Sequence, residues 1–148
     1  LFAVSRRFPS RTITVKIHAA DGRIEFAHGS VSSETDKASF LASPLGHTAE
    51  VVVENGPYVT YRVSPEPGIG ATFLFKGERL ENLAWAFRLP DESDSNWSEE
   101  TEMRVKGLHD AWLLESLGQP PYRYLWGKIV SEYDAKAVSS AIIVVYDR

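Results

Sequence analysis

The sequence predicts an α+β fold: an antiparallel sheet of six or more strands, built from hairpins and covered by one long helix near the C-terminus. Two observations predict it. Apolar and polar residues alternate over residues 12–28 and again over 49–89, which is the period of half-buried strands. Between residues 91 and 118 the apolar spacing changes to that of a helix. Hairpins followed by one helix are typical of a sheet with a helix packed on one face.

The first hairpin is expected within "TITVKIHAADGRIEFAH", where Asp21–Gly22 supplies the positive φ angles of a two-residue turn. In the register that this turn sets, Ile17 lies opposite Phe26, and the apolar faces of both strands coincide. Residues 29–48 follow as a long loop with one helical turn at "SFLA".

Four further strands are expected in the middle of the chain. "AEVVVENGPYVTYRV" predicts a hairpin around "ENGP". Because Pro57 has no N–H to donate, we expect a four-residue connection there rather than a tight two-residue turn. After a break at "SPEPGIG", the segment "ATFLFKGERLENLAWAFRLP" predicts two more strands joined around "KGERLEN".

The helix is expected within "DESDSNWSEETEMRVKGLHDAWLLESLG". Asn96 or Ser98, each followed by acidic residues, can accept the free N–H groups of its first turn. Gly118 fits the position just past its last turn. The apolar stripe of the helix consists of Val105, Leu108 and Trp112.

Two final strands are expected in "YRYLWGKIVSEYDAKAVSSAIIVVY", paired around "DAKA" so that Ser131 faces Ser140. Both faces of this pair are apolar, which is typical of strands buried on both sides. Gly127 would leave a gap for a helix side chain such as Trp112. Trp126 is therefore expected in the core rather than in an exposed aromatic platform.

The composition bounds the class of protein. At 148 residues the chain fits one domain, residues 1–148, and 43% hydrophobic with 24% charged residues is typical of globular proteins. A net charge of −4 argues against a general nucleic-acid binder but leaves room for a basic protein partner. No apolar run approaches the ~18 residues of a membrane span. The chain has no cysteine, so its composition fits cytoplasm and periplasm alike, and it sets no oligomeric state.

The histidines are the natural place to look for an enzyme. His18 lies across from Glu25 on the polar face of the first hairpin, either as a catalytic base with its orienting carboxylate or as an exposed charge pair. His28, His47 and His109 have no second group at a catalytic or metal-binding spacing. No zinc, phosphate-loop, dinucleotide or serine-hydrolase motif occurs. The sequence thus predicts no catalytic residue, metal or cofactor, and a small hydrolase-type enzyme stays an alternative.

The acidic residues are distributed unevenly. Six of the twelve residues from 91 to 102 are acidic and none is basic, whereas the first sixteen residues hold four basic residues and no acid. Such a run either steers a basic partner or forms a solvated loop whose glutamates complement the helix dipole. The partner-binding candidates are this run and two tyrosines of "PPYRY", which we expect beside the acidic helix start: Asp91, Glu92, Asp94, Glu99, Glu100, Glu102, Tyr122 and Tyr124.

The last third of the chain resembles a known pattern. The segment from Glu100 to Tyr146, which contains "DAWLLESLGQPPYRYLWGKIVSEYDAKAVSSAIIVVY", resembles the C-terminal segment of small bacterial proteins. Such proteins are often immunity proteins, which neutralise a toxin delivered by a secretion system. The resemblance implies a non-enzymatic protein that covers the active site of a cognate toxin, and it carries no catalytic motif. A carbohydrate- or ligand-binding module with Trp85 or Trp126 in a groove is a further alternative.

Overall fold

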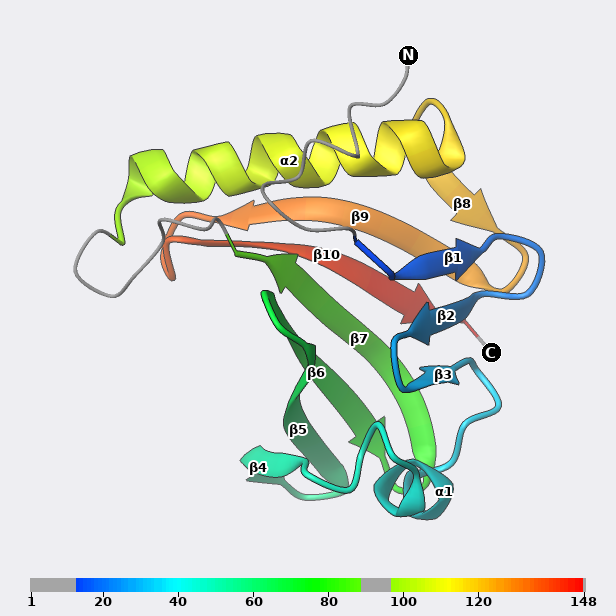
Figure 1. The fold of residues 1–148 in the computed structure, drawn as a ribbon. Coiled ribbons are helices and arrows are strands. Elements are labelled where there is room, and N and C mark those ends of the chain that lie inside the picture. Colours follow the sequence, from blue (N-terminus) through cyan, green and yellow to red (C-terminus); the bar gives the residue numbers. More distant parts are fainter. Residues whose placement is uncertain (1–12, 89–96, 148) are drawn as a thin grey trace.

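The computed structural model describes residues 13–88 and 97–147 (Figure 1). Seven antiparallel strands form a large sheet in the order β4-β5-β6-β7-β10-β9-β8, and three form a small sheet in the order β1-β2-β3. The strands are β1 (Lys16–His18), β2 (Arg23–Phe26), β3 (Gly29–Val31), β4 (Glu50–Asn55), β5 (Tyr58–Glu66), β6 (Ile69–Lys76), β7 (Arg79–Phe87), β8 (Tyr122–Tyr124), β9 (Gly127–Asp134) and β10 (Ser139–Tyr146). The helices are α1 (Lys37–Ala42) and α2 (Glu99–Leu117). The predicted α+β class, with an antiparallel sheet and a long late helix, is confirmed.

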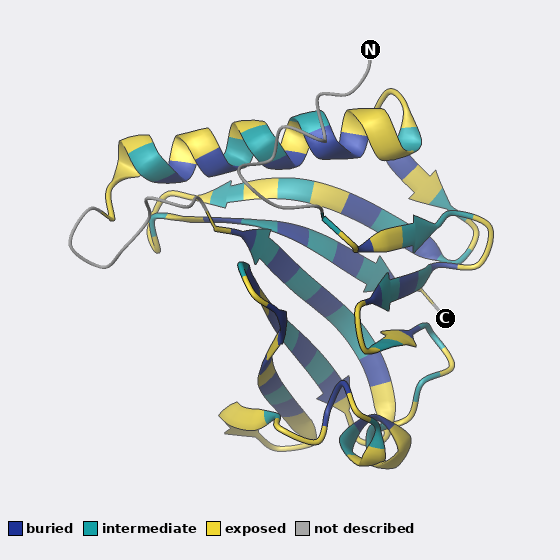
Figure 2. Cartoon of the chain, viewed as in Figure 1, coloured by how far each residue is buried: buried dark blue, intermediate teal, exposed yellow. Residues whose placement is uncertain are grey.

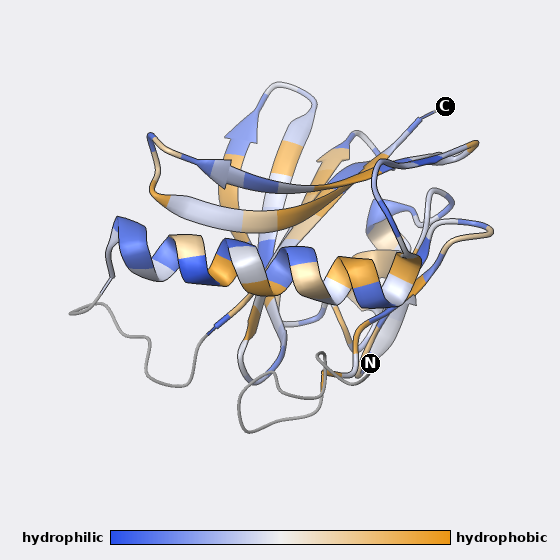
Figure 3. Cartoon of the chain, turned by 90° about the horizontal axis from the view of Figure 1, so that it is seen from above, coloured by the Kyte–Doolittle hydropathy of each residue, from blue (hydrophilic) through white to orange (hydrophobic). Residues whose placement is uncertain are grey.

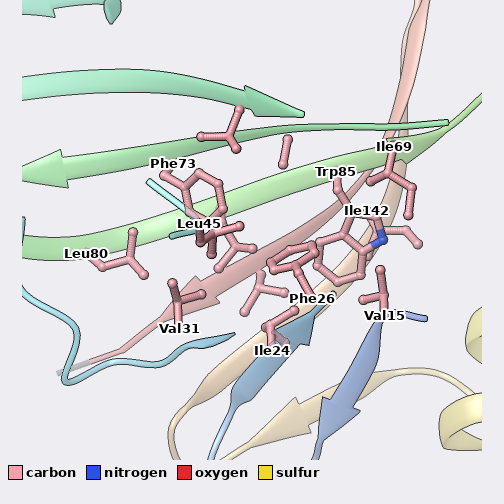
Figure 4. Close-up of a cluster of buried hydrophobic side chains, with 14 of the residues drawn as sticks. Val15, Ile24, Phe26, Val31, Leu45, Ile69, Phe73, Leu80, Trp85 and Ile142 are labelled. Atoms are coloured by element: carbon pink, nitrogen blue, oxygen red, sulfur yellow. The ribbon is translucent and has the colours of Figure 1, made fainter. Parts of the chain in front are cut away.

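The core lies between the large sheet on one side and α2, α1 and the small sheet on the other. Figure 4 shows part of it, where Phe26 of the small sheet lies beside Trp85 of the large sheet. Trp85 of β7 lies at the centre of this core and is 1% exposed. Its ring meets Phe26 of β2 edge-on at 5.8 Å and Trp112 of α2 at 6.2 Å between centroids. Phe40 of α1 extends the core toward β6 by packing against Phe73 at 4.8 Å. The helix and the small sheet therefore share one apolar layer with the large sheet.

The first hairpin is formed, but its turn and register differ from the prediction. Ile17 pairs with Ile24 rather than with Phe26. The connection is a four-residue turn in which the N–H of Gly22 donates to the carbonyl of His18 at 2.8 Å. A shift of two residues keeps the same side chains on the core face, so the apolar pattern does not distinguish the two registers.

The loop over residues 29–48 contains the expected helical turn as α1. Its N-cap Asp36 accepts a hydrogen bond from the Ser39 N–H at 2.7 Å. The same segment also contributes β3, which has only three residues. A strand this short is too brief for an alternating pattern to indicate it.

The turn of the second hairpin is tight, and the expected four-residue connection is wrong. Asn55 pairs with Tyr58, which leaves only Gly56 and Pro57 between the strands. Gly56 has a φ of 62°, which suits the first position of such a turn. Pro57 lies outside the strand ladder, so its missing N–H removes no strand bond, while its carbonyl accepts from the Gly77 N–H at 2.8 Å.

The helix α2 begins and ends at predicted capping residues. Ser98 is its N-cap and accepts from the Thr101 N–H at 3.1 Å, and Gly118 follows the last turn with a φ of 87°. Leu108 of the predicted stripe is only half-buried. The buried face consists of Glu102, Val105, His109, Trp112 and Leu113.

The last hairpin is also shifted by two residues from its predicted register. Ser131 pairs with Ile142, two residues beyond its expected partner, because a four-residue loop connects Asp134 to Ser139. Successive side chains of β9 point to opposite faces, and Val130, which points away from the core, is 36% exposed. The expectation that this strand pair is buried on both faces is therefore wrong.

Gly127 does not make room for Trp112. Its φ is 151°, and an added Cβ would collide with the carbonyl oxygen of Val145. Glycine is needed there because two backbones approach closely. Trp112 packs instead against Trp85 and Phe87.

Candidate protein-binding surface

The first turn of α2 presents a negative surface. Ser98 caps the turn, and Glu99 and Glu100 follow with exposed side chains. Their charges lie at the positive end of the helix dipole, which stabilises them. Figure 3 shows hydrophilic residues gathered at this end of α2. Three predicted members of the acidic run lie outside the described residues: Asp91, Glu92 and Asp94.

Glu102 is buried and takes part in the fold. It is 6% exposed, and its Oε1 accepts from the Ser140 N–H at 3.0 Å. The Glu102 carbonyl also accepts from the Ser140 hydroxyl at 2.8 Å. Because this pair fixes α2 to β10, the Glu102 carboxylate is not presented to a partner. Its spacing to Val105, His109 and Trp112 is that of one helix face, and this spacing is the sequence signal of its burial.

Two aromatic residues border the acidic turn. Trp97 is 53% exposed, and its indole N–H donates to the Val138 carbonyl at 3.0 Å. The Tyr133 hydroxyl donates to Glu99 Oε2 at 3.3 Å. Desolvation, and then the negative charge of Glu99, raise the pKa of Tyr133. We call Trp97, Glu99, Glu100 and Tyr133 the acidic corner.

The tyrosines of "PPYRY" lie at the opposite end of α2, so the expectation that they lie beside the acidic helix start is wrong. The helix has 19 residues, which separates its ends by about 28 Å. Tyr122 is 8% exposed, and its hydroxyl donates to the Gly118 carbonyl at 2.9 Å. Tyr124 is half-buried and stacks on Trp126 with ring centroids 4.9 Å apart. Both tyrosine rings are held by contacts within the chain.

Trp126 packs against the core rather than forming an open platform. Its indole N–H donates to the Ala19 carbonyl at 2.7 Å. Its ring lies over Gly22, where an added Cβ would be 2.6 Å from the ring. Trp85, the other indole considered for a ligand groove, is buried in the core and closed to such a ligand.

A cavity of about 530 Å³ lies between the second half of α2, the two prolines that follow it, and β9. Its charged lining consists of Lys106, Asp110, Arg123 and Lys128. Three of these residues are basic and one is acidic. The acidic one, Asp110, forms an ion pair with Lys106 at 2.8 Å, which leaves Arg123 and Lys128 as the excess positive charge of the lining. The lining of this cavity is thus mainly basic, whereas the first turn of α2 is acidic.

The structure brings His18 and Glu25 together despite the shifted register. His18 Nε2 lies 3.0 Å from Glu25 Oε1, and the Arg23 guanidinium lies 3.4 Å from both side chains. The hydrogen bond with His18 is the largest cause that lowers the pKa of Glu25. The three side chains are 34–41% exposed, which favours a surface charge network. Within residues 13–88 and 97–147, no group of three His, Cys, Asp or Glu side chains could hold a metal ion.

Comparison with known proteins supports a fold assignment. No protein-family model matches the sequence, and no curated protein is significantly similar to it. The fold is similar to that of one chain of a solved complex described as "Rhs1-CT in complex with cognate immunity protein RhsI1", with a TM-score of 0.56 at 12% identity. The match covers 90% of this chain and 87% of that chain. At this level of identity, the match shows that this chain shares its fold with one chain of that toxin–immunity complex.

Neither described helix is both long and apolar enough to cross a lipid bilayer.

Proposed function

We propose that this chain is an immunity protein that binds one cognate bacterial toxin and covers its active site. The observation that carries the proposal is the fold, which is similar over 90% of its length to a chain of a complex that contains a cognate immunity protein. The resemblance of residues 100–146 to immunity proteins supports the same role. Inhibition of this kind needs no bond to be made or broken. It needs a complementary surface of about 800 Å² on each partner.

We propose the acidic corner as part of this surface. Trp97 exposes 53% of its surface next to two carboxylates, and tryptophan and tyrosine are among the residues that most often dominate binding energy at interfaces. Met103 lies one turn further along α2, is 48% exposed, and adds apolar area beside the corner. Glu99 and Glu100 favour a basic toxin surface, such as one that lines a substrate groove.

The immunity function is tested by expressing this chain with and without the toxin domain encoded beside its gene. We expect the toxin alone to arrest growth, this chain alone to leave growth unchanged, and the two together to restore growth. A complex of both chains should elute as one peak in size-exclusion chromatography. Growth arrest by this chain alone would assign it to the toxin side of such a pair, and a lack of protection would end the proposal.

Charge reversal tests the acidic corner. The double variant Glu99→Lys/Glu100→Lys should bind the toxin about tenfold to a hundredfold more weakly at low salt, because two attractive charges become repulsive toward a basic surface. The difference should shrink as ionic strength rises, since salt screens exposed charges. Titration calorimetry at low and high salt measures both effects.

The matched control is Glu34→Lys/Asp147→Lys, which changes the net charge equally at two exposed positions away from the acidic corner. We expect it to bind nearly as tightly as the unmodified chain. Equal losses in both double variants would show that net charge acts at long range, and no loss in either would remove the acidic corner from the interface.

A further inference from the structure

The strand β4 lies at the end of the large sheet opposite β8, and among the described residues it pairs with β5 alone. All six of its residues are exposed (Figure 2). Val51, Val52 and Val53 at its centre are 55%, 43% and 55% exposed. Tyr58, across the turn on β5, is 39% exposed. We call β4 together with Tyr58 the β4 edge, which is an apolar patch on an open strand.

Within the part of the chain that the structure describes, one side of the β4 backbone has no strand beside it. One row of its N–H and C=O groups meets β5, and the other row points away from the described sheet because β4 is the last strand in it. Proteins usually protect such an edge with lysine, proline or a bulge. β4 has a bulge between Val51 and Val53, but its sequence, "EVVVEN", contains neither lysine nor proline. The charged residues of β4 are the two glutamates that flank its valines, so the apolar centre of this edge can receive a further strand.

Two carboxylates flank the valines of β4. Glu50 lies 3.6 Å from the Arg62 guanidinium, and these side chains are 72% and 61% exposed, so the pair is weak and easily exchanged. Glu54 lies opposite Val59, which brings no charge to it. The strand thus presents an acidic, then apolar, then acidic row. Its complement is an extended segment with an apolar centre and a basic residue near each end.

A second copy of this chain fits the β4 edge poorly. Antiparallel pairing of two β4 strands that aligns their valines places Glu50 of each copy opposite Glu54 of the other. Like charges directly opposite one another destabilise a strand pair. The row of charges therefore favours a different, basic chain over a symmetric dimer.

We propose that the β4 edge binds an extended segment of the cognate toxin, apolar at its centre and basic at both flanks, as an added strand of the large sheet. This inference rests on the proposed immunity function and specifies a part of its surface. Backbone hydrogen bonds along β4 hold the segment, while Glu50 and Glu54 select its basic flanks.

Hydrogen–deuterium exchange tests the added strand directly. The full chain is exchanged alone and with the purified toxin domain encoded beside its gene. We expect amides within residues 50–55 that exchange rapidly in the free chain to slow by at least tenfold in the complex, because their outward N–H groups gain partners. If the complex forms and these amides exchange as fast as before, the β4 edge is not the docking site.

Variants of the exposed edge separate its backbone and charge contributions. Val52→Lys introduces the charge that proteins use to protect an edge, and should weaken toxin binding at least tenfold. Its matched control is Val52→Thr, which keeps a β-branched side chain at the same position and should bind like the unmodified chain. Glu50→Lys/Glu54→Lys should also lose at least tenfold, and more at low salt. Circular dichroism of each free variant checks that the fold is retained.

The outcomes distinguish this inference from the function on which it rests. If the unmodified chain does not bind the toxin, the proposed function fails. If it binds and protects cells while both β4 variants bind equally well, only the β4 inference fails. Slow exchange of residues 50–55 in the free chain together with a dimer in light scattering would show that a second copy occupies the edge.

Discussion

His109 of α2 is fully buried, and its surroundings hold the ring in the neutral state. Nε2 lies 3.1 Å from the Phe87 N–H and accepts it, which places the ring proton on Nδ1. Within the described residues, Nδ1 has no hydrogen-bond partner. Burial lowers the pKa of His109 to about 4, while Asp110 opposes the shift and Lys106 adds to it. Protonation would add a hydrogen to Nε2, so that two N–H donors, one of His109 and one of Phe87, would face each other.

The lowered pKa makes stability depend on pH in a defined window. The unfolded chain binds a proton at His109 near pH 6.5, whereas the folded chain binds it only near pH 4. The contribution of His109 is therefore complete above pH 6.5 and is lost as the pH falls toward 4, by about 3 kcal/mol in total. Urea unfolding at a series of pH values measures this loss. His109→Gln keeps an acceptor for the Phe87 N–H without the titration, so an unchanged pH dependence in this variant would contradict the assignment.

Local spacing could identify some residues of the candidate surface and not others. The burial of Glu102 follows from its place on the same helix face as Val105 and His109, so its sequence position predicts it. The placement of Trp97 depends on the carbonyl of Val138, 41 residues later. No pattern within the helix segment contains that contact, which is why Trp97 was not among the predicted residues.

The helix α2 is fixed to the large sheet at its acidic end by the hydrogen bonds between Glu102 and Ser140. Glu102→Ala should lower the free energy of unfolding by about 2–3 kcal/mol, because the buried Ser140 N–H loses its charged acceptor. Glu102→Gln keeps an acceptor and should lose less. Denaturant titration gives each value. The control Glu100→Ala, in the same turn but exposed, should stay within about 0.5 kcal/mol of the unmodified chain; equal losses at both positions would contradict the role of Glu102.

In a strand, the residue pattern can indicate which face is buried, but it does not determine the register. Alternation assigned the correct core face to the first hairpin but not to the last, where both faces are apolar. Both predicted registers differ from the structure by two residues, as the pairing of Ile17 with Ile24 shows. The side-chain period of a strand is two, so loops of two and four residues present the same face. Only turn geometry separates them, and the hydrogen bond of Gly22 to His18 is not visible in the pattern. The open edge at β4 likewise follows from sheet order, which local periodicity does not contain.

Over the whole molecule, the small N-terminal sheet is joined to the C-terminal strands. The Tyr146 hydroxyl donates to the Gly22 carbonyl at 2.8 Å, across 124 residues of sequence. The Trp126 indole donates to the Ala19 carbonyl, across 107 residues. These two hydrogen bonds connect both ends of the described chain. That residues 1–148 form one domain stays a prediction. Such a domain should unfold in a single cooperative step.

Replacement of Gly22 tests this joint between the two sheets. Gly22 has a φ of 77°, and a Cβ there would lie 2.6 Å from the Trp126 ring, so Gly22→Ala should combine backbone strain with displacement of the indole. Gly77→Ala is the matched control, because its φ is 58° and no atom lies within 4 Å of the added Cβ. We expect Gly77→Ala to lose about 1 kcal/mol of unfolding free energy and Gly22→Ala about 1–3 kcal/mol more.

Far-ultraviolet circular dichroism and tryptophan fluorescence should give coincident transitions in the unmodified chain and in both variants. Equal losses would mean that the Trp126 contact contributes nothing, and separate transitions would mean that the two sheets unfold as independent units.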